Sequence, residues 1–150
     1  MSKPEFVYVI YIQSTPARIW DALIDPEMTT EYWGRHRNRS DWKPGSRWHH
    51  ENYDDANDIA VAGTVVESDP PRRLVLTWGH PGTADPISRV SFEIEEFMGA
   101  ARLTVTHSDL SAEMYRSIST GWPAVLSSLK SLIETGASLP MTRRQWKRTG

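Results

Sequence analysis

Three histidines are the residues of this sequence best placed for chemistry, because each shares a strand face with large apolar side chains. Side chains two apart in a strand point to the same face of a sheet. The histidines and their in-phase neighbours are His50 with Trp48, His80 with Trp78, and His107 with Val105. Buried imidazoles need hydrogen-bond partners that an ordinary apolar core does not offer. The pattern therefore indicates an aromatic cavity with a few polar anchors.

Catalytic or metal-binding roles would require these histidines to meet further geometric conditions. Zinc accepts three imidazoles and a water, but a three-histidine site would need three separate strands in matching register. His49 and His50 alternate across a strand and cannot chelate one metal from the same face. Asp109 could orient His107 as a general base, yet it stands at a strand end, where a helix-capping role is the simpler interpretation. We predict no metal site and no catalytic residue.

Motifs of the common nucleotide, zinc and serine-nucleophile sites are absent: GxGxxG, GxxxxGK[ST], HExxH and GxSxG do not occur. The acidic segment 54–58 lacks the twelve-residue calcium pattern and its closing glutamate, so we interpret it as a hairpin loop. Glu95 and Glu96 fall on opposite faces of a strand, which argues against an acid and base pair. We expect no cofactor.

The composition fits one domain that folds without metal or disulfide. The chain has 150 residues, 39% hydrophobic and 24% charged, which suffices for a sizeable core. It has no cysteine, which excludes disulfides and agrees with a reducing compartment. The N-terminus has no signal-like apolar segment, and no stretch approaches the roughly 18 apolar residues of a membrane span. We expect a soluble, cytoplasmic protein without membrane contact.

Charge gives no sign of a nucleic-acid partner, because the formal net charge is -2 and both signs are interspersed. The one basic cluster lies near the C-terminus, at Arg143, Arg144, Lys147 and Arg148. We interpret it as a solvated, flexible tail at 141–150 that follows a single domain at 1–140.

The chain opens with a strand at 6–12 and two short helices. Ser14 or Thr15 can cap the first helix, and Pro16 suits its first position. Asp25 and Pro26 repeat this signal and predict a second helix at roughly 27–33. Five further strands, six with the first, are expected at 46–53, 59–67, 72–80, 87–96 and 100–108, with a turn-rich segment at 80–86 and a turn near Gly99.

The last element is an amphipathic helix at roughly 120–135. Its apolar stripe comprises Trp122, Val125, Leu126, Leu129, Leu132 and Ile133. Ser119 or Thr120 can cap it, Pro123 falls in its first turn, and Gly136 can end it. Six buried side chains of this size offer on the order of 10 kcal/mol, which is comparable to the stability of a whole domain. The sheet is therefore expected to curve around this helix and to leave a cavity.

Several segments resemble the helix-grip superfamily of START domains and pollen-allergen-like proteins (SRPBCC). Within it they are similar to the group related to the activator of heat-shock-protein-90 ATPase. The segments are IQSTPARIWDALIDPE (12–27), KPGSRW (43–48), GTVVESDPPRRLVLTW (63–78), RLTVTHSDL (102–110) and GWPAVLSSLKSLIE (121–134). The resemblance covers roughly residues 5–136 and implies an α+β fold in which an antiparallel sheet wraps around a long C-terminal helix.

The resemblance implies binding of a small hydrophobic or aromatic molecule between sheet and helix. Two alternatives stay open: an enzyme of the cyclase, aromatase or hydrolase type, and an activator of a chaperone ATPase with a role in the stress response. We rank the chaperone role lower, because 150 residues leave no room for the additional N-terminal domain of the eukaryotic activator. A homodimer is also left open.

The residues expected to line the cavity come from the inward strand phases and from the ends of the helices. They are Trp33, Trp48, His50, Trp78, His80, Phe92, His107, Met114 and Trp122. Trp122 lies at the start of the closing helix, where its ring face and indole N–H are expected to contact the ligand.

Overall fold

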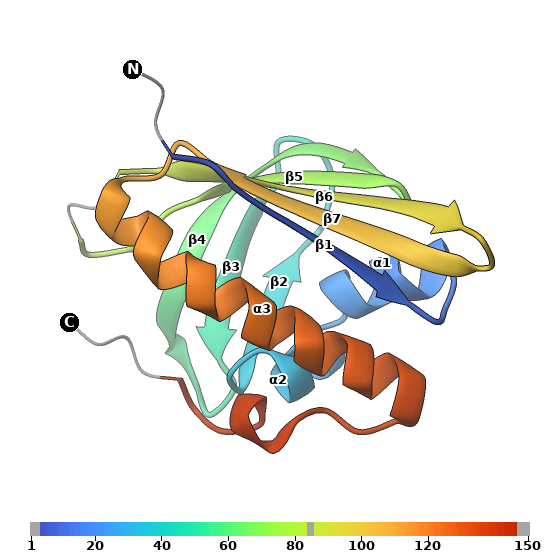
Figure 1. Ribbon diagram of the computed structural model, residues 1–150. Helices are drawn as coiled ribbons and strands as arrows, with labels where there is room; N and C mark the ends of the chain where they lie inside the picture. The colour runs from blue at the N-terminus through green and yellow to red at the C-terminus, as the bar shows by residue number, and fades with distance from the viewer. Residues whose placement is uncertain (1–3, 84–85, 147–150) are drawn as a thin grey trace.

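An antiparallel sheet curves around a long C-terminal helix in the computed structural model, which describes residues 4–83 and 86–146 (Figure 1). Within these residues the sheet has seven strands in the order β1-β7-β6-β5-β4-β3-β2. The strands are β1 (Phe6–Ile12), β2 (His36–Ser40), β3 (Arg47–Asn52), β4 (Asp55–Asp69), β5 (Arg73–Trp78), β6 (Ser88–Phe97) and β7 (Ala100–Ser108). The helices are α1 (Pro16–Ile24), α2 (Pro26–Tyr32), α3 (Ala112–Thr135) and the short 3-10 helix η1 (Pro140–Thr142). The predicted α+β helix-grip fold is confirmed.

The sheet has one strand more than the sequence suggested. Strand β2 has the sequence HRNRS, without the apolar alternation that usually reveals a strand. Its inward positions are His36 and Asn38, which are buried although they are polar. Strand β4 is also longer than expected: it begins at Asp55, so most of the acidic segment predicted as a loop continues the ladder with β3.

The two short helices follow the predicted capping signals. The side chain of Thr15 accepts a hydrogen bond from the backbone N–H of Arg18, and Pro16 opens α1. The carboxylate of Asp25 accepts from the backbone N–H of Glu27 at the start of α2. Together α1 and α2 close one end of the curved sheet, beside the C-terminal half of α3 (Figure 1).

Helix α3 begins earlier than predicted, at Ala112 instead of near residue 120, and Ser111 caps it by accepting from the backbone N–H of Met114. The extra turns are stable because Met114 and Ile118 extend the apolar stripe towards the N-terminus at helical spacing. Pro123 consequently lies inside the helix. The predicted end is confirmed, since Gly136 adopts the left-handed conformation with φ of 87°.

The predicted inward phases of the central strands are confirmed. Val90, Phe92 and Ile94 of β6 are buried, as are Leu103 and Val105 of β7. The alternate residues of β6 and β7 lie on the convex face, where charged pairs such as Arg102 with Glu95 form across the strands. The core therefore lies between the concave face of the sheet and α3.

The segment after α3 returns to the body of the protein. The backbone N–H of Leu139 donates to Oγ of Ser128 in α3, and Oγ1 of Thr142 lies 2.6 Å from the same oxygen. The side chain of Gln145 donates to Asn52 at the end of β3. Residues 141–146 of the segment predicted as a flexible tail thus make defined contacts. Residues 84 and 85 of the expected turn, and the basic residues Lys147 and Arg148, lie outside the described residues.

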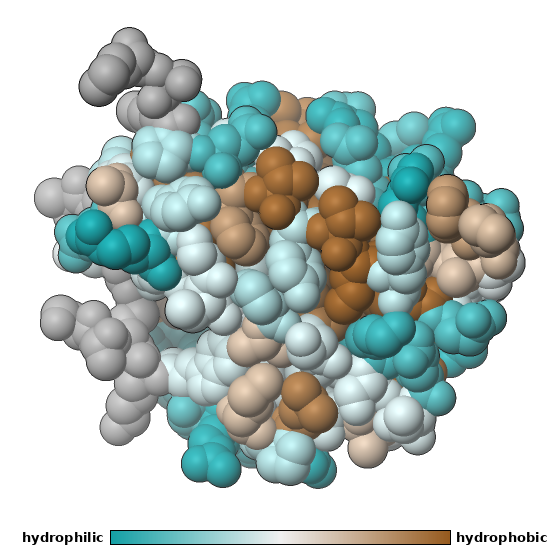
Figure 2. Space-filling model, viewed as in Figure 1, coloured by the Kyte–Doolittle hydropathy of each residue, from teal (hydrophilic) through white to brown (hydrophobic). Residues whose placement is uncertain are grey.

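Apolar side chains on the face seen in Figure 2 gather along the edge strand β1 and beside α3, and polar side chains surround them. Val7 and Val9 on the convex side of β1 are exposed. Among the helices of the described residues, none combines the length and the apolar character needed to cross a membrane.

Candidate functional site

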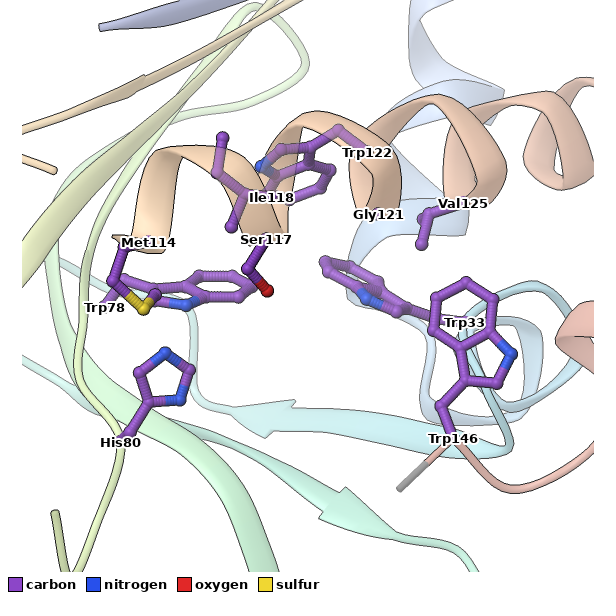
Figure 3. Close-up of a pocket in the computed structure, with 10 residues that line it drawn as sticks. All are labelled: Trp33, Trp78, His80, Met114, Ser117, Ile118, Gly121, Trp122, Val125 and Trp146. Atoms are coloured by element: carbon purple, nitrogen blue, oxygen red, sulfur yellow. The ribbon is translucent and has the colours of Figure 1, made fainter. Parts of the chain in front are cut away.

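An aromatic cavity of about 190 Å³ lies under the N-terminal half of α3 (Figure 3). Its walls come from α3, from the end of β5 and from two segments far apart in sequence. The lining residues are Trp33, Trp78, His80, Met114, Ser117, Ile118, Gly121, Trp122, Val125 and Trp146. In Figure 3 the residues of α3 face Trp33, Trp78, His80 and Trp146 across this space. We call it the inner cavity.

A larger space of about 610 Å³ adjoins the inner cavity and shares much of its lining, including Trp33 and Trp78. This outer cavity adds His36 and His50 from the sheet. It also adds Glu113 and Thr120 from α3, together with Ala60, Val61 and Ala124. The exposed side chains of Glu113 and Thr120 mark where the outer cavity meets the surface.

Three tryptophans pack against one another and shape the inner cavity. The ring centroids of Trp33 and Trp122 are 5.3 Å apart, and those of Trp78 and Trp122 are 5.6 Å apart. Trp33 and Trp78 are stacked at 6.2 Å. Each comes from a different element, since Trp33 caps α2, Trp78 ends β5 and Trp122 lies on α3. These contacts hold the rings in place without filling the space beside them.

Trp146 completes the wall from the C-terminal segment. Its backbone N–H donates to the carbonyl oxygen of Gly34, and its indole N–H donates to the carbonyl oxygen of Met141. Gly34 has φ of +63°, and a Cβ built there would lie 2.8 Å from Cγ of Trp146. A glycine is therefore required at this position both by backbone conformation and by the close approach of the indole.

A buried hydrogen-bond chain lies behind the cavity wall. The indole N–H of Trp122 donates to Nδ1 of His107 over 3.1 Å. Because an indole nitrogen can only donate, Nδ1 of His107 must accept, so the imidazole hydrogen is on Nε2. Nε2 lies 2.7 Å from Oγ of Ser88, which in turn donates to the carbonyl oxygen of Trp78. Burial, with a smaller effect from His80, lowers the pKa of His107 to about 4, so the ring is neutral at pH 7.

The Ser88 and His107 pair has the wrong polarity for nucleophilic catalysis. In a catalytic pair, Nε2 of the histidine accepts the hydrogen of the serine hydroxyl. A separate hydrogen-bond acceptor beside Nδ1 keeps the hydrogen of the imidazole on that nitrogen. Here the donor on Nδ1 is an indole, which places the hydrogen on Nε2 and makes Ser88 the acceptor. Both residues are buried, and neither lines the inner or the outer cavity.

Two further imidazoles are stacked at the outer cavity. The ring centroids of His36 and His50 are 4.7 Å apart and their planes differ by 10°. Nδ1 of His36 donates to the carbonyl oxygen of Gly34 over 2.7 Å. Nδ1 of His50 donates to Oδ1 of Asn38 over 2.6 Å. Burial, followed by the neighbouring histidines, holds the pKa of His50 well below its usual value.

Six of the nine residues predicted for the site line one or both cavities: Trp33, His50, Trp78, His80, Met114 and Trp122. Trp48, Phe92 and His107 have inward phases but are packed behind the wall. The indole N–H of Trp48 donates to the carbonyl oxygen of Thr77, and the ring of Phe92 packs edge-on against Trp122.

Some lining residues absent from the predicted site come from segments whose structure was predicted wrongly. Ile118 precedes the predicted start of α3 near residue 120, where its helical spacing from Met114 would have identified it. Gly121 and Val125 lie within the predicted helix but were not assigned to the site. His36 lies in the unpredicted strand β2. Trp146 was assigned to the tail, although a large indole among basic residues is itself a sign of a packed segment.

The described residues contain no group of three histidine or acidic side chains placed to hold a metal ion. Both ring nitrogens of His107 are engaged, so it cannot join His50 and His80 as a ligand in this arrangement. Asp109 does not orient His107, because Trp122 occupies Nδ1. Asp109 also does not cap α3, since that position is Ser111.

The fold and its cavity define a helix-grip protein. Over residues 13–134 the sequence matches the family described as Activator of Hsp90 ATPase homolog 1-like protein. Because this match spans most of the chain, the protein belongs to that family.

Solved structures share the fold at low sequence identity. CalU16 from Micromonospora echinospora is 20% identical with a TM-score of 0.73, covering 88% of this chain and 77% of its own. PFC0360w, an HSP90 activator from Plasmodium falciparum, is 17% identical with a TM-score of 0.72, covering 86% and 95%. DynU16, from the dynemicin biosynthetic locus, is 20% identical with a TM-score of 0.77, covering 95% of this chain and 51% of its own. A search of curated proteins gave no match.

Proposed function

We propose that the protein binds a small hydrophobic or aromatic molecule in the cavity between α3 and the sheet. The observation that carries this proposal is the unfilled space of about 190 Å³ walled by Trp33, Trp78, Trp122 and Trp146. Protein interiors are close-packed, and empty volume destabilises the native state. A flat apolar ligand would fill this space and stack on the rings, as in most small-molecule sites.

The size and chemistry of the two cavities favour an aromatic ligand of two or more rings. An apolar cavity of about 150 Å³ already holds benzene. The inner cavity exceeds that volume and continues into the outer cavity of about 610 Å³. Tryptophan faces and the Met114 thioether give favourable contacts to aromatic rings.

A titration with 2-methoxynaphthalene tests the proposal, because this probe is flat, uncharged and without a hydrogen-bond donor. We expect it to quench the fluorescence of the cavity tryptophans and to raise the melting temperature, since a ligand selective for the native state stabilises it. Absence of both effects at saturating probe would refute the binding function.

Two variants of Gly121 provide the matched control. Gly121 lines both cavities, and a Cβ built there meets no heavy atom outside the neighbouring helix turns within 4 Å. Gly121→Leu is expected to fill the cavity and to weaken probe binding at least tenfold, without loss of stability because leucine favours helix. Gly121→Ala adds one methyl group and should keep most of the affinity.

Activation of a chaperone ATPase is a second candidate, favoured by the description of the family and by the likeness to PFC0360w. It predicts faster ATP hydrolysis by a purified heat-shock-protein-90 chaperone when this protein is added. An unchanged rate at high micromolar protein would remove this candidate and leave ligand binding intact.

A further inference from the structure

The stacked pair of His36 and His50 presents two hydrogen-bond acceptors to the outer cavity. The Nδ1 atom of each ring donates to an oxygen within the protein, so each Nε2 of the neutral ring carries a lone pair. Within the described residues, neither Nε2 atom has a hydrogen-bond partner. Neither atom is among the described side-chain polar atoms that are both fully buried and without a partner. Both rings line the outer cavity. A ligand in the outer cavity would therefore meet the Nε2 edge of each ring.

Burial keeps the acceptor of His50 neutral. His50 is only 6% exposed and His36 only 5%. Burial and the neighbouring imidazoles lower the pKa of His50 well below its usual value, so a proton from solvent is disfavoured there at pH 7. A neutral imidazole with its hydrogen fixed on Nδ1 accepts a hydrogen bond at Nε2 and cannot donate one there.

The charge of the cavity walls restricts the ligand further. Among the described residues, those lining the inner and outer cavities include no lysine or arginine, and their one carboxylate is that of Glu113. A carboxylate or phosphate group would lose its hydration there without meeting an opposite charge. The site is therefore unsuited to anions such as fatty acids.

We propose that the His36 and His50 pair selects an uncharged aromatic ligand that carries a hydroxyl group, with the rings of the ligand against the tryptophans and its O–H directed at an imidazole Nε2. This inference rests on the proposed binding function and names the class of ligand. Trp33 connects the two regions, since its ring lies 4.9 Å from His50 and also lines the inner cavity. A phenol-type molecule can thus engage both at once.

A metal ion is the less suitable occupant of this pair. The planes of the two rings differ by only 10° and their centroids are 4.7 Å apart, so the lone pairs of the two rings lie in separate, nearly parallel planes. Zinc requires ligand lone pairs that converge tetrahedrally on one point. Among the described residues no third histidine or carboxylate stands in place to complete a site.

Three naphthalene probes of similar size test the inference on the wild-type protein. 2-Naphthol carries the hydroxyl donor, 2-methoxynaphthalene lacks it, and 2-naphthoate is an anion at pH 7. We expect 2-naphthol to bind about fivefold more tightly than 2-methoxynaphthalene, the value of one net hydrogen bond, and 2-naphthoate to bind most weakly. Equal affinity for the first two probes, or tightest binding of 2-naphthoate, would overturn the inference. If none of the probes binds, the proposed function itself fails.

Phenylalanine variants test whether His36 and His50 cause the preference for 2-naphthol. His36→Phe and His50→Phe keep a planar ring but remove both nitrogens, so each is expected to lower the preference for 2-naphthol over 2-methoxynaphthalene. The control is His49→Phe, on the same strand as His50 but on the opposite face, where the imidazole bonds to Glu51. It should retain the full preference.

The ratio of two affinities is insensitive to the fraction of folded protein, so a modest loss of stability does not obscure the result. A preference that survives in both His36→Phe and His50→Phe would overturn the inference. If one variant does not fold, the other variant and the wild-type probe series decide.

Discussion

The indole N–H of Trp122 donates to Nδ1 of His107 over 3.1 Å, so the same side chain walls the cavity and anchors a buried polar chain. The sequence suggested that this N–H would serve a ligand. The structure assigns it to the protein instead and leaves only the ring face for the cavity. Under the proposed function, polar contacts to a ligand would therefore come from other residues, such as His36 and His50 of the outer cavity.

Replacing Trp122 by phenylalanine should destabilise the fold by about 1–3 kcal/mol, because Nδ1 of the buried His107 loses its donor. Urea unfolding of Trp122→Phe, of His107→Leu, whose side chain cannot accept the hydrogen bond, and of the double variant measures the coupling between the two positions. We expect non-additive losses. Strictly additive losses would show that the hydrogen bond contributes nothing to stability.

Acid should weaken the fold through His107. Its pKa is lowered from about 6.5 to about 4 in the native state, so only the unfolded chain takes up this proton between those values. Stability is therefore complete above pH 6.5 and falls as the pH decreases towards 4, by up to about 3 kcal/mol. Urea unfolding at pH 7, 6 and 5 measures the slope.

The variant His107→Gln isolates this contribution. A glutamine can accept from Trp122 and donate to Ser88 without titrating. We expect a flatter dependence of stability on pH in this variant, with the remainder due in part to His50, whose pKa is lowered for the same reason. An unchanged slope would show that His107 is not the titrating group.

The fold was predictable from the sequence because its signals are local and repeated. Thr15 and Asp25, each followed by a proline, marked the starts of α1 and α2. Strand β2 escaped because its inward residues, His36 and Asn38, are polar and are stabilised by partners on other elements, which periodicity cannot reveal.

The site was harder to predict than the fold. Strand phase correctly indicated that Trp48, Phe92 and His107 point inwards, but it does not distinguish a side chain that lines a cavity from one packed behind it. That distinction depends on contacts between distant elements, such as the one from Trp122 to His107. Trp146 reaches the cavity only because the chain after α3 folds back to Gly34.

Displacing Trp146 should open the cavity. In Gly34→Ala the new Cβ would overlap the indole of Trp146 and would also occupy a left-handed backbone position. Gly45→Ala is the matched control, because Gly45 has φ of +89° but nothing within 4 Å of the added Cβ. Both should lose about 1–2 kcal/mol of stability from backbone strain, and Gly34→Ala should lose more because of the overlap. Only Gly34→Ala is expected to weaken binding of 2-methoxynaphthalene. Equal affinities in the two variants would contradict a wall role for Trp146.

A substitution on the convex face of the sheet should lower the stability of the protein without weakening ligand binding. The buried carboxylate of Glu51 accepts hydrogen bonds from Arg37 and His49, away from the cavity. Glu51→Gln should cost about 2 kcal/mol, since it leaves Arg37 without its charged partner. Glu95→Gln, in an exposed pair with Arg102, should change little. Calorimetry and probe titration together check this, and a large loss of affinity in folded Glu51→Gln would contradict the assignment of binding to the opposite face.

A crystal structure of the protein with 2-methoxynaphthalene is the most direct test of the cavity as a ligand site. The account predicts electron density for a flat two-ring molecule under α3, in contact with Trp33 and Trp78. Density for the probe elsewhere on the surface, with the space beside Trp122 closed by rearranged side chains, would contradict it.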